Sequence, residues 1–436
     1  MGQGVVSRRR LLGLAVTPAV LAACGRQENL DELPKTAVSE GKVIYSTWGS
    51  SHQREVENWS LLAFEKNYEG LKVDVVWAQT VAEHVAKQYS LLSGGTPPDV
   101  MRLPAWSAPT FYNEEVVLRL DPYFRRDGFR PEEFLAAPYD VATFRRGWYA
   151  IPRGQSGTWV IFYNRRAFSQ AGLAAPTAAW TWDDFLNAAR ELTRPGPSGA
   201  QRWGVALESL VEFFYPWLWG AGGDDIDPTR ESSAIDQPAA QEALTWLADL
   251  RHRHRVAPPA GELADPFAAF VSGQVAMWYG PADAELELAT AQPAVDYAIA
   301  PQPKGRSGQH GGYRPDVMSL STIGQHSDDG WELLQFLVDL DAQRLEFQNG
   351  LWLPQAKAIV SEETYQRPAG PPFDRRPGIP GLGFRARTPV ILPRGDEMRA
   401  AMLKELTPFW QGTTGVKDAT AAASRAVNAI LKGGQE

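Results

Sequence analysis

Hydrophobic positions along the first part of the chain follow two alternating patterns, which predict strands followed by helices. Residues 42–48 are rich in β-branched and aromatic side chains and end at a glycine, as expected of a strand that enters a loop. In residues 55–68 the apolar positions fall three or four apart, which predicts a helix. The order returns with a strand at 71–77, a helix at 81–92 and a third strand from 98. Such alternation implies crossover units and a largely parallel sheet.

The stretch 147–164 interrupts this order and predicts a passage between two lobes. Two β-prone runs, 148–151 and 158–163, flank the sequence Pro-Arg-Gly-Gln-Ser-Gly. Proline cannot donate to a sheet ladder and glycine permits unusual backbone angles, so one sheet should stop at Pro152 and another should start near Thr158. Similar breaks at 300–301 and 350–354 predict two more crossings. In open α/β sheets ligands bind beyond the carboxyl ends of the strands, so we expect a ligand between the lobes.

Beyond the first crossing the alternation of strands and helices restarts. Thr181 is followed by acids in the first predicted turn, which is typical of a helix N-cap. Further patterns predict a strand at 203–207, an amphipathic helix at 239–252, a strand near 274–280 and a closing helix at 419–431. The run 213–220 is strongly aromatic, and 367–395 is rich in Pro, Gly and Arg and is expected to be irregular.

The N-terminus has the pattern of an export signal. Arg8, Arg9 and Arg10 precede an uncharged run that ends in Leu-Ala-Ala-Cys at Cys24. The arginines and the leucines after them resemble a twin-arginine signal, and the last four residues resemble a lipobox, in which the cysteine is acylated. We therefore expect a signal peptide at 1–23 and a lipid-proximal tether at 24–40, with the protein held on the outer face of the cytoplasmic membrane or in the periplasm. An incidental thiol at Cys24 and export by the general secretory route are the alternatives.

Composition narrows the class of protein. With 44% hydrophobic and 22% charged residues among 436, the chain fits a globular protein of two ordinary domains. The formal charge is −8 and becomes −11 without the three arginines of 1–23, which argues against nucleic acid as a partner. The single cysteine excludes an intramolecular disulfide, and no motif calls for a metal or another cofactor.

Short motifs in sequential order resemble the extracellular solute-binding proteins of sugar ABC transporters, the group that includes maltose-binding protein. They run from Phe64-Glu65-Lys66 to Leu353-Pro354, and in between are Gly94–Val100, Ile151-Pro152, Tyr163-Asn164, Ala171-Gly172-Leu173, Thr181–Phe185, Gly222-Gly223, Ala276-Met277, Gly280, Pro303-Lys304-Gly305 and Gly311-Gly312. Two positions depart from the family pattern. Pro281-Ala282-Asp283 follows Gly280 where many members carry an aromatic residue, and Arg165 replaces a lysine.

The resemblance implies an α/β protein with a two-lobe periplasmic-binding-protein fold. Each lobe would be a mainly parallel sheet flanked by helices, with three hinge crossings. The N-terminal lobe would comprise 41–150 plus 302–350, and the C-terminal lobe 151–301 plus 351–436. It also implies a monomer that traps a carbohydrate by lobe closure, performs no chemistry on it, and delivers it to the transmembrane subunits of an ABC permease.

Sugar sites combine flat apolar faces with planar polar groups, which Trp and the Asp, Gln and Arg side chains supply. We expect such contacts at strand ends, in the first crossing and after the later breaks, at Ser50, Ser51, Gln79, Trp106, Gln155, Ser156, Trp217, Trp219, Asp224, Asp283, Tyr313, Arg314 and Trp352. Simpler roles compete: turn hydrogen bonds for Gln155 and Ser156, core packing for Trp217 and Trp219, and a turn cap for Asp224.

Two other functions fit parts of the sequence. The tryptophan and carboxylate content would suit a secreted glycoside-acting enzyme, for which Glu208 and Asp224 give a weak carboxylate pair. The same binding fold could also hold another solute, such as a polyol phosphate or a peptide. The sequence does not identify the sugar, its length or its linkage.

Overall fold

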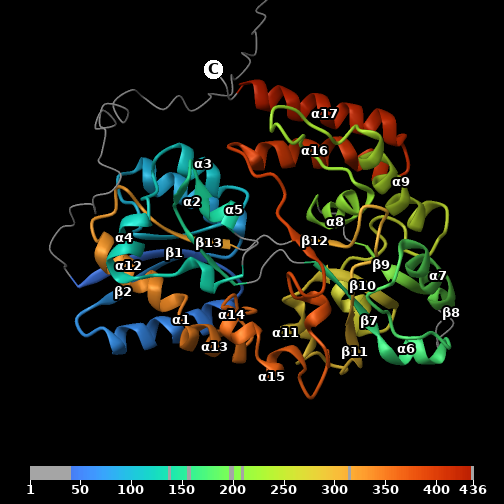
Figure 1. Ribbon diagram of the computed structural model, residues 1–436, viewed down its shortest axis with the longest axis horizontal. Coiled ribbons are helices and arrows are strands. Elements are labelled where there is room, and N and C mark those ends of the chain that lie inside the picture. Colours follow the sequence, from blue (N-terminus) through green and yellow to red (C-terminus); the bar gives the residue numbers. More distant parts are fainter. Residues whose placement is uncertain are drawn as a thin grey trace, which may run out of the picture.

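Two α/β lobes lie side by side in the computed structural model, which describes residues 41–135, 139–154, 159–195, 201–207, 211–312 and 316–433 (Figure 1). The sheet of the N-terminal lobe has the strand order β2-β1-β3-β13-β6. The sheet of the C-terminal lobe has the order β11-β7-β10-β9-β8. The predicted two-lobe α/β architecture is therefore confirmed.

The N-terminal lobe packs helices against both faces of its sheet. Its core includes the buried rings of Tyr45, Phe64 and Trp331. Its strands are β1 (Lys42–Trp48), β2 (Lys72–Ala78), β3 (Val100–Leu103), β6 (Ile151–Arg153) and β13 (Asp316–Leu320), and its main helices are α1 (Ser51–Asn67), α2 (Val81–Ser93), α3 (Ala108–Asn113), α4 (Asp121–Asp127), α12 (Ser327–Leu337) and α13 (Leu340–Gln348).

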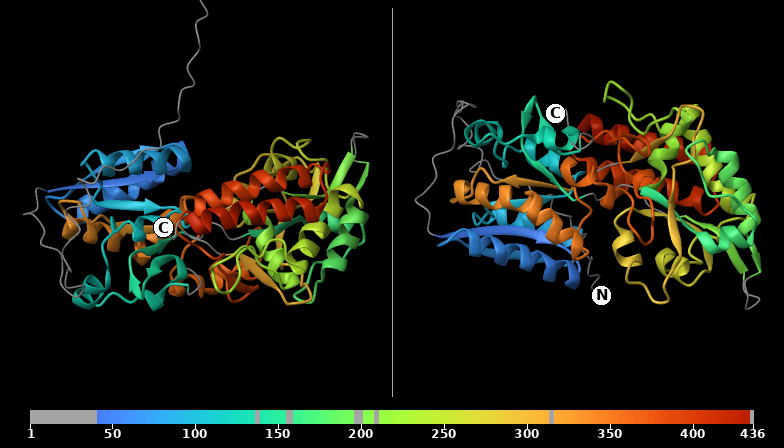
Figure 2. Two further views of the ribbon diagram at one scale, coloured as in Figure 1. Left: turned by 90° about the horizontal axis from the view of Figure 1, so that it is seen from above. Right: turned by 60° about the horizontal axis from the view of Figure 1, so that its bottom comes forward.

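The C-terminal lobe contains the last two long helices of the chain, which lie along each other in both views of Figure 2. The first contributes Met398, Met402 and Leu406, and the second Ala423 and Val427, to the same core as the aromatic helix α8 (Val211–Ala221). The strands are β7 (Trp159–Asn164), β8 (Arg194–Pro195), β9 (Gln201–Ala206), β10 (Val275–Pro281) and β11 (Tyr297–Ala300), and the main helices are α6 (Arg165–Gln170), α7 (Trp182–Leu192), α8 (Val211–Ala221), α9 (Pro238–His252), α10 (Pro266–Val271), α11 (Ala284–Leu288), α16 (Gly395–Trp410) and α17 (Val416–Gly433).

The first crossing lies where the sequence predicts it. Strand β6 pairs with β13 in one sheet, whereas β7 pairs with β10 and β11 in the other. The first sheet continues one residue further than expected, through Pro152 to Arg153. Strand β6 is at the edge of its sheet, where the missing N–H of a proline is tolerated.

Both sheets are more mixed than the expected mainly parallel arrangement. Strands β1, β2 and β3 are parallel, as are β9 and β10. Strands β13 and β7 instead run antiparallel to their neighbours. Each of these two strands enters its sheet directly from a crossing, so it runs away from the edge at which the parallel strands end. The crossings themselves therefore account for most of the antiparallel pairs.

The second crossing comes later than the boundary expected at residue 302. The Lys304 N–H donates to the Trp180 carbonyl at 2.8 Å, and β12 (His310–Gly312) pairs with β14 (Arg385–Arg387) beside α8. Residues 302–312 thus stay with the C-terminal lobe, and the N-terminal sheet is re-entered only at β13. Pro301 follows the last residue of strand β11, but the chain does not change lobe at this point.

The third break also differs from the expected boundary at 351. The Leu135 N–H donates to the Gln355 carbonyl at 3.0 Å, and Phe134 pairs with Ala356. Residues immediately after the break therefore remain attached to the N-terminal lobe, and the C-terminal lobe is joined further along the chain.

A buried ion network holds the hinge end of strand β6. Arg153 Nη1 donates to Glu57 Oε1 at 2.6 Å and to the Tyr45 hydroxyl at 2.9 Å, and Nη2 pairs with Glu346. Glu57 lies on α1 and Glu346 on α13, so one guanidinium ties the hinge strand to two helices. Removing one member of such a network would leave a buried charge without its partner, which destabilises the fold.

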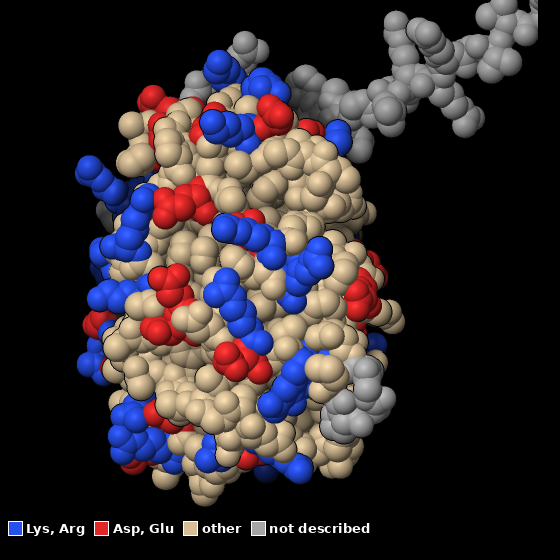
Figure 3. All heavy atoms as spheres, turned by 90° about the vertical axis from the view of Figure 1, so that its right-hand side faces the viewer, with Lys and Arg blue, Asp and Glu red and all other residues tan. Residues whose placement is uncertain are grey.

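The outer face of the C-terminal lobe carries positive and negative side chains interspersed (Figure 3). Among the residues described, no helix combines the length and the apolar character needed to span a bilayer.

Candidate functional site

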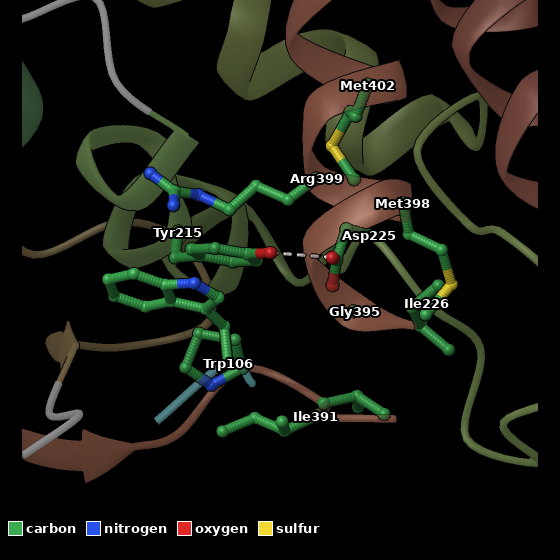
Figure 4. Close-up of a pocket in the computed structure, with 11 residues that line it drawn as sticks. Trp106, Tyr215, Asp225, Ile226, Ile391, Gly395, Met398, Arg399 and Met402 are labelled. Carbon is green, nitrogen blue, oxygen red and sulfur yellow. Dashed lines mark hydrogen bonds between the residues drawn. The ribbon is translucent and has the colours of Figure 1, made fainter. Parts of the chain in front are cut away.

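A small pocket lies where the two lobes meet (Figure 4). Trp106, in the loop after β3, is its contribution from the N-terminal lobe. Tyr215 on α8 and Asp225 in the loop after it come from the C-terminal lobe, together with Met398 and Arg399 of α16. The pocket therefore combines aromatic faces, apolar side chains, a carboxyl group and a guanidinium group.

Aromatic and cationic groups lie together at one end of the pocket. The Arg399 guanidinium carbon is 5.0 Å from the centre of the half-buried Trp106 ring, which is cation–π geometry. The Tyr215 ring lies close to both side chains in Figure 4. Trp106 is the sequence-predicted residue that the structure places in the pocket.

Asp225 provides the buried polar group of the pocket. Its side chain is 3% exposed, and Oδ2 accepts a 2.7 Å hydrogen bond from the Tyr215 hydroxyl. Oδ1 has no hydrogen-bond partner within the described part of the chain. Burial, and then the neighbouring Asp224 charge, raise the pKa of the Asp225 carboxyl to about 7.

Asp224 and Trp219 form a layer behind the pocket. Asp224 accepts from Trp219 Nε1 at 3.0 Å and from Arg387 Nη2 at 2.7 Å. The Arg387 guanidinium also covers the Trp219 ring, and Trp219 stacks on Tyr215 with centroids 5.5 Å apart. Neither predicted residue lines the pocket, but together they support the tyrosine that does.

The structure places Trp217 in the core, which corrects its assignment as a cleft residue. Its ring is fully buried and stacks on Trp246 with centroids 4.8 Å apart. The sequence interpretation allowed Trp217 and Trp219 to alternate with buried neighbours. The run is helix α8, in which Tyr215 and Trp219, four residues apart, share a face.

Three further candidates at strand ends lie away from the pocket. Ser50 caps α1 by accepting from the Gln53 N–H at 3.2 Å, and Ser51 begins that helix. Gln79 is exposed after β2 and its N–H donates to Glu83. These contacts are local turn and cap hydrogen bonds. The candidates Gln155, Ser156, Tyr313 and Arg314, and the expected acylation site Cys24, lie outside the described residues.

Trp352 and Asp283 belong to the hinge region. The Arg102 guanidinium lies 4.3 Å from the centre of the Trp352 ring and 3.7 Å from that of the Trp48 ring, and it pairs with Asp316 at 2.6 Å. Asp283 is the N-cap residue of α11; burial comes first among the causes that raise its pKa to about 6, and the charges of Glu287 and then Asp316 add to it. Neither side chain lines the pocket.

Sequence reasoning missed Tyr215, Asp225 and the α16 side chains Met398, Arg399 and Met402. The spacing of Met398, Met402 and Leu406 is helical, so the pattern of α16 was present in the sequence. The described residues contain no group of His, Cys, Asp and Glu side chains that could hold a metal ion.

A family model described as bacterial extracellular solute-binding protein matches residues 49–344, well over half of the chain. The chain belongs to this family. A curated relative, an uncharacterized ABC transporter extracellular-binding protein of Pyrococcus horikoshii, is 23% identical and the alignment covers 97% of this chain and 95% of the relative.

Solved structures of two solute-binding proteins have the same fold. An ABC substrate-binding protein from Listeria monocytogenes, in complex with cycloalternan, has a TM-score of 0.79 at 21% identity and covers 90% of this chain and 100% of its own. A Mycobacterium tuberculosis protein in complex with glycerophosphocholine has a TM-score of 0.76 at 19% identity and covers 91% and 100%. As a member of an extracellular family, the chain is an exported solute-binding protein.

Proposed function

We propose that this solute-binding protein captures a carbohydrate between its lobes and delivers it to the permease of an ABC importer. The pocket at the lobe boundary supports the proposal most directly, because Trp106 and Tyr215 offer flat apolar faces beside the polar Asp225 and Arg399. Sugar rings present C–H faces and hydroxyl edges that match this combination. The cycloalternan complex of the Listeria relative agrees with it.

Thermal-shift screening against a panel of solutes tests the ligand class. A solute that binds only the folded protein raises the unfolding midpoint. We expect an oligosaccharide to do so for the native chain and to lose most of its effect in Trp106→Ala. We also propose Gln155, Ser156, Tyr313 and Arg314 as cleft contacts, to be tested by alanine substitution with the same solute. A panel of glycans without any shift would contradict the carbohydrate assignment.

Lobe closure is the second part of the proposal. A solute that contacts both lobes only in the closed form shifts the population toward that form. Small-angle scattering should therefore show a smaller radius of gyration with the solute than without it. Binding without compaction would contradict capture by closure.

A non-sugar solute is the alternative within the same fold. The Arg399 guanidinium in the pocket and the glycerophosphocholine complex of the Mycobacterium relative favour it. Including glycerophosphocholine, glycerol phosphate and short peptides in the panel separates the two classes. A shift with one of these and none with glycans would support the alternative.

We propose that the captured solute is released unchanged. Asp224, the described member of the candidate carboxylate pair, is engaged by Arg387 and Trp219, which is unfavourable for a catalytic acid. Prolonged incubation with oligosaccharides followed by product chromatography tests this. Hydrolysis or transfer products would support a glycoside-acting enzyme instead.

We propose that a lipid at Cys24 tethers a monomer to the membrane after export. The lipobox-like sequence and the polar segment 24–40 support this. Cys24→Ala should move the protein from the detergent phase to the aqueous phase, and replacing Arg8 and Arg9 by lysine should reduce export if the twin-arginine route is used. Aqueous partitioning of the native protein would contradict the lipid anchor.

A further inference from the structure

We infer that Asp225 is a specificity-determining contact: its Oδ1 accepts a hydrogen bond from the solute, so the pocket selects solutes that present a hydroxyl or N–H donor and releases a proton when it binds one. This inference rests on the proposed solute-capture function and assigns one side chain its part in that function.

The geometry of the carboxyl group carries the inference. Oδ2 is occupied by the Tyr215 hydroxyl at 2.7 Å, whereas Oδ1 has no partner in the part of the chain that is described. The group is 3% exposed and lines the pocket. A buried acceptor without a donor is costly, and a solute donor in the pocket would satisfy it.

The charged neighbours do not compensate Asp225. Asp224 beside it carries a like charge and is itself engaged by Arg387 of β14 and Trp219 of α8. Across the pocket, Arg399 of α16 lies over Trp106. Arg387 pairs with Asp224, and the described residues give Asp225 no ion pair, so no cation offsets the charge of its ionised form.

The burial of Asp225 and its acidic neighbour also determine its protonation. Burial and the Asp224 charge raise the pKa of Asp225 to about 7, so part of the population carries a proton at neutral pH. A hydrogen bond from the solute is stronger to the ionised carboxylate than to the neutral acid. Since the group is already almost fully buried, the solute adds little further desolvation. Binding therefore favours the ionised form and lowers the pKa, and a proton is released.

The sign of the pH dependence is set by this linkage. Affinity should rise as pH increases from 6 to 8 and level off above the pKa of the unliganded protein. A fall of one unit in the pKa on binding, from about 7, corresponds to about a fivefold change in Kd between pH 6 and pH 8 and to tenfold at the limit of low pH. A merely structural carboxyl that only holds Tyr215 would change stability with pH but would release no proton on binding.

Isothermal titration calorimetry of the full chain tests the inference. The probes are maltotriose, raffinose and glycerophosphocholine, each measured at pH 6, 7 and 8 and, at pH 7, in phosphate and in Tris, whose ionisation enthalpies differ. For a probe that binds, we expect a Kd about five to ten times lower at pH 8 than at pH 6, with fractional proton release at pH 7.

Substitutions test whether Asp225 is the group that releases the proton and makes Kd depend on pH. Asp225→Asn should bind with no proton release and a pH-independent Kd, while Asp418→Asn, at an exposed position on α17 of the same lobe, should behave as the native protein. Tyr215→Phe removes the hydrogen bond that lowers the Asp225 pKa, so its pH midpoint should move upward. This variant keeps the carboxyl group and serves if Asp225→Asn does not fold.

The results separate a failure of the role assigned to Asp225 from a failure of the proposed solute capture. Binding with an unchanged Kd at pH 6 and 8, or proton release that persists in Asp225→Asn, overturns the inference alone. If no probe binds, the carbohydrate proposal and the inference both fall.

Discussion

Asp224 and Asp225 are adjacent in sequence but have opposite surroundings. Asp224 accepts from Arg387 and Trp219, whereas Asp225 is enclosed by the pocket with the Tyr215 hydroxyl as its donor. Desolvation therefore dominates at Asp225 and raises its pKa to about 7. The two carboxylates cannot be distinguished from the local sequence. Their pKa values differ because Arg387, which is distant in sequence, pairs with Asp224 and not with Asp225.

Asp225→Asn should change how stability depends on pH. An acid with a raised pKa binds its proton more tightly when folded, so the stability it contributes is present below the unfolded pKa and is lost as pH rises through about 7. The variant lacks this loss, and its melting temperature relative to the native protein should increase from pH 5 to pH 8. The expected scale is about 1.4 kcal/mol per unit of pKa difference. Parallel melting curves at both pH values would contradict the buried carboxylate.

Trp217 and Trp106 should respond differently to substitution by alanine. Trp217 is fully buried among Trp182, Phe185 and Trp246, so Trp217→Ala should lower the free energy of unfolding by about 3–5 kcal/mol. Trp106 is half-buried at the pocket, so its loss should affect solute binding more than urea denaturation. Equal destabilisation by both substitutions would contradict this distinction.

At the scale of elements, the end of the hinge strand β6 depends on the glycine that follows it, Gly154. Gly154 has φ +71°, and a Cβ there would lie 2.9 Å from the Trp352 ring. Gly172 has the same φ but open space around it, which makes Gly172→Ala a matched control. Both variants meet the cost of left-handed backbone, about 1–2 kcal/mol, and only Gly154→Ala adds a clash. Urea denaturation should therefore rank Gly154→Ala as the less stable, and equal losses would contradict the contact with Trp352.

Arg153→Met should be among the most damaging changes in the N-terminal lobe. It would leave Glu57 and Glu346 buried without their cation, and removing one partner of a buried network costs about 3–5 kcal/mol. The loss should be smaller at pH 5 than at pH 7, because burial raises the pKa of Glu346 to about 7 and its protonated carboxyl tolerates burial better. Arg145→Met, at an exposed position, provides the control. Denaturation curves at the two pH values test both the size and the trend.

The elements that the sequence predicts well are those marked by local chemistry. Pro152 and the glycines after it locate the first crossing, and Thr181 is the expected N-cap, which in the structure forms a capping box with Asp184. Helix α16 was missed because it follows a Pro- and Gly-rich stretch and its N-cap, Arg394, makes no side-chain capping bond. The lobe boundaries at 302 and 351 depend on pairing between distant strands, which no local pattern records.

For the whole molecule, the core of the C-terminal lobe depends on α16 and α17, whereas all five strands of the N-terminal sheet lie before residue 321. A chain truncated after Pro393 should therefore lose hydrogen-exchange protection in β7, β9 and β10 and retain it in β1 and β3. The full chain is the control. Equal loss in both sheets would show that the lobes unfold as one unit.

Three crossings also have a consequence for the order of synthesis. When the ribosome has made β1, β2 and β3, the nascent chain still lacks β13, which joins β3 to the hinge strand β6. Almost all of the other lobe is made before its final two helices emerge. Both lobes therefore expose apolar surface until late in translation. The C-terminal lobe does so until α16 and α17 have been made. Holdase chaperones should engage this polypeptide for longer than one whose domains are each contiguous.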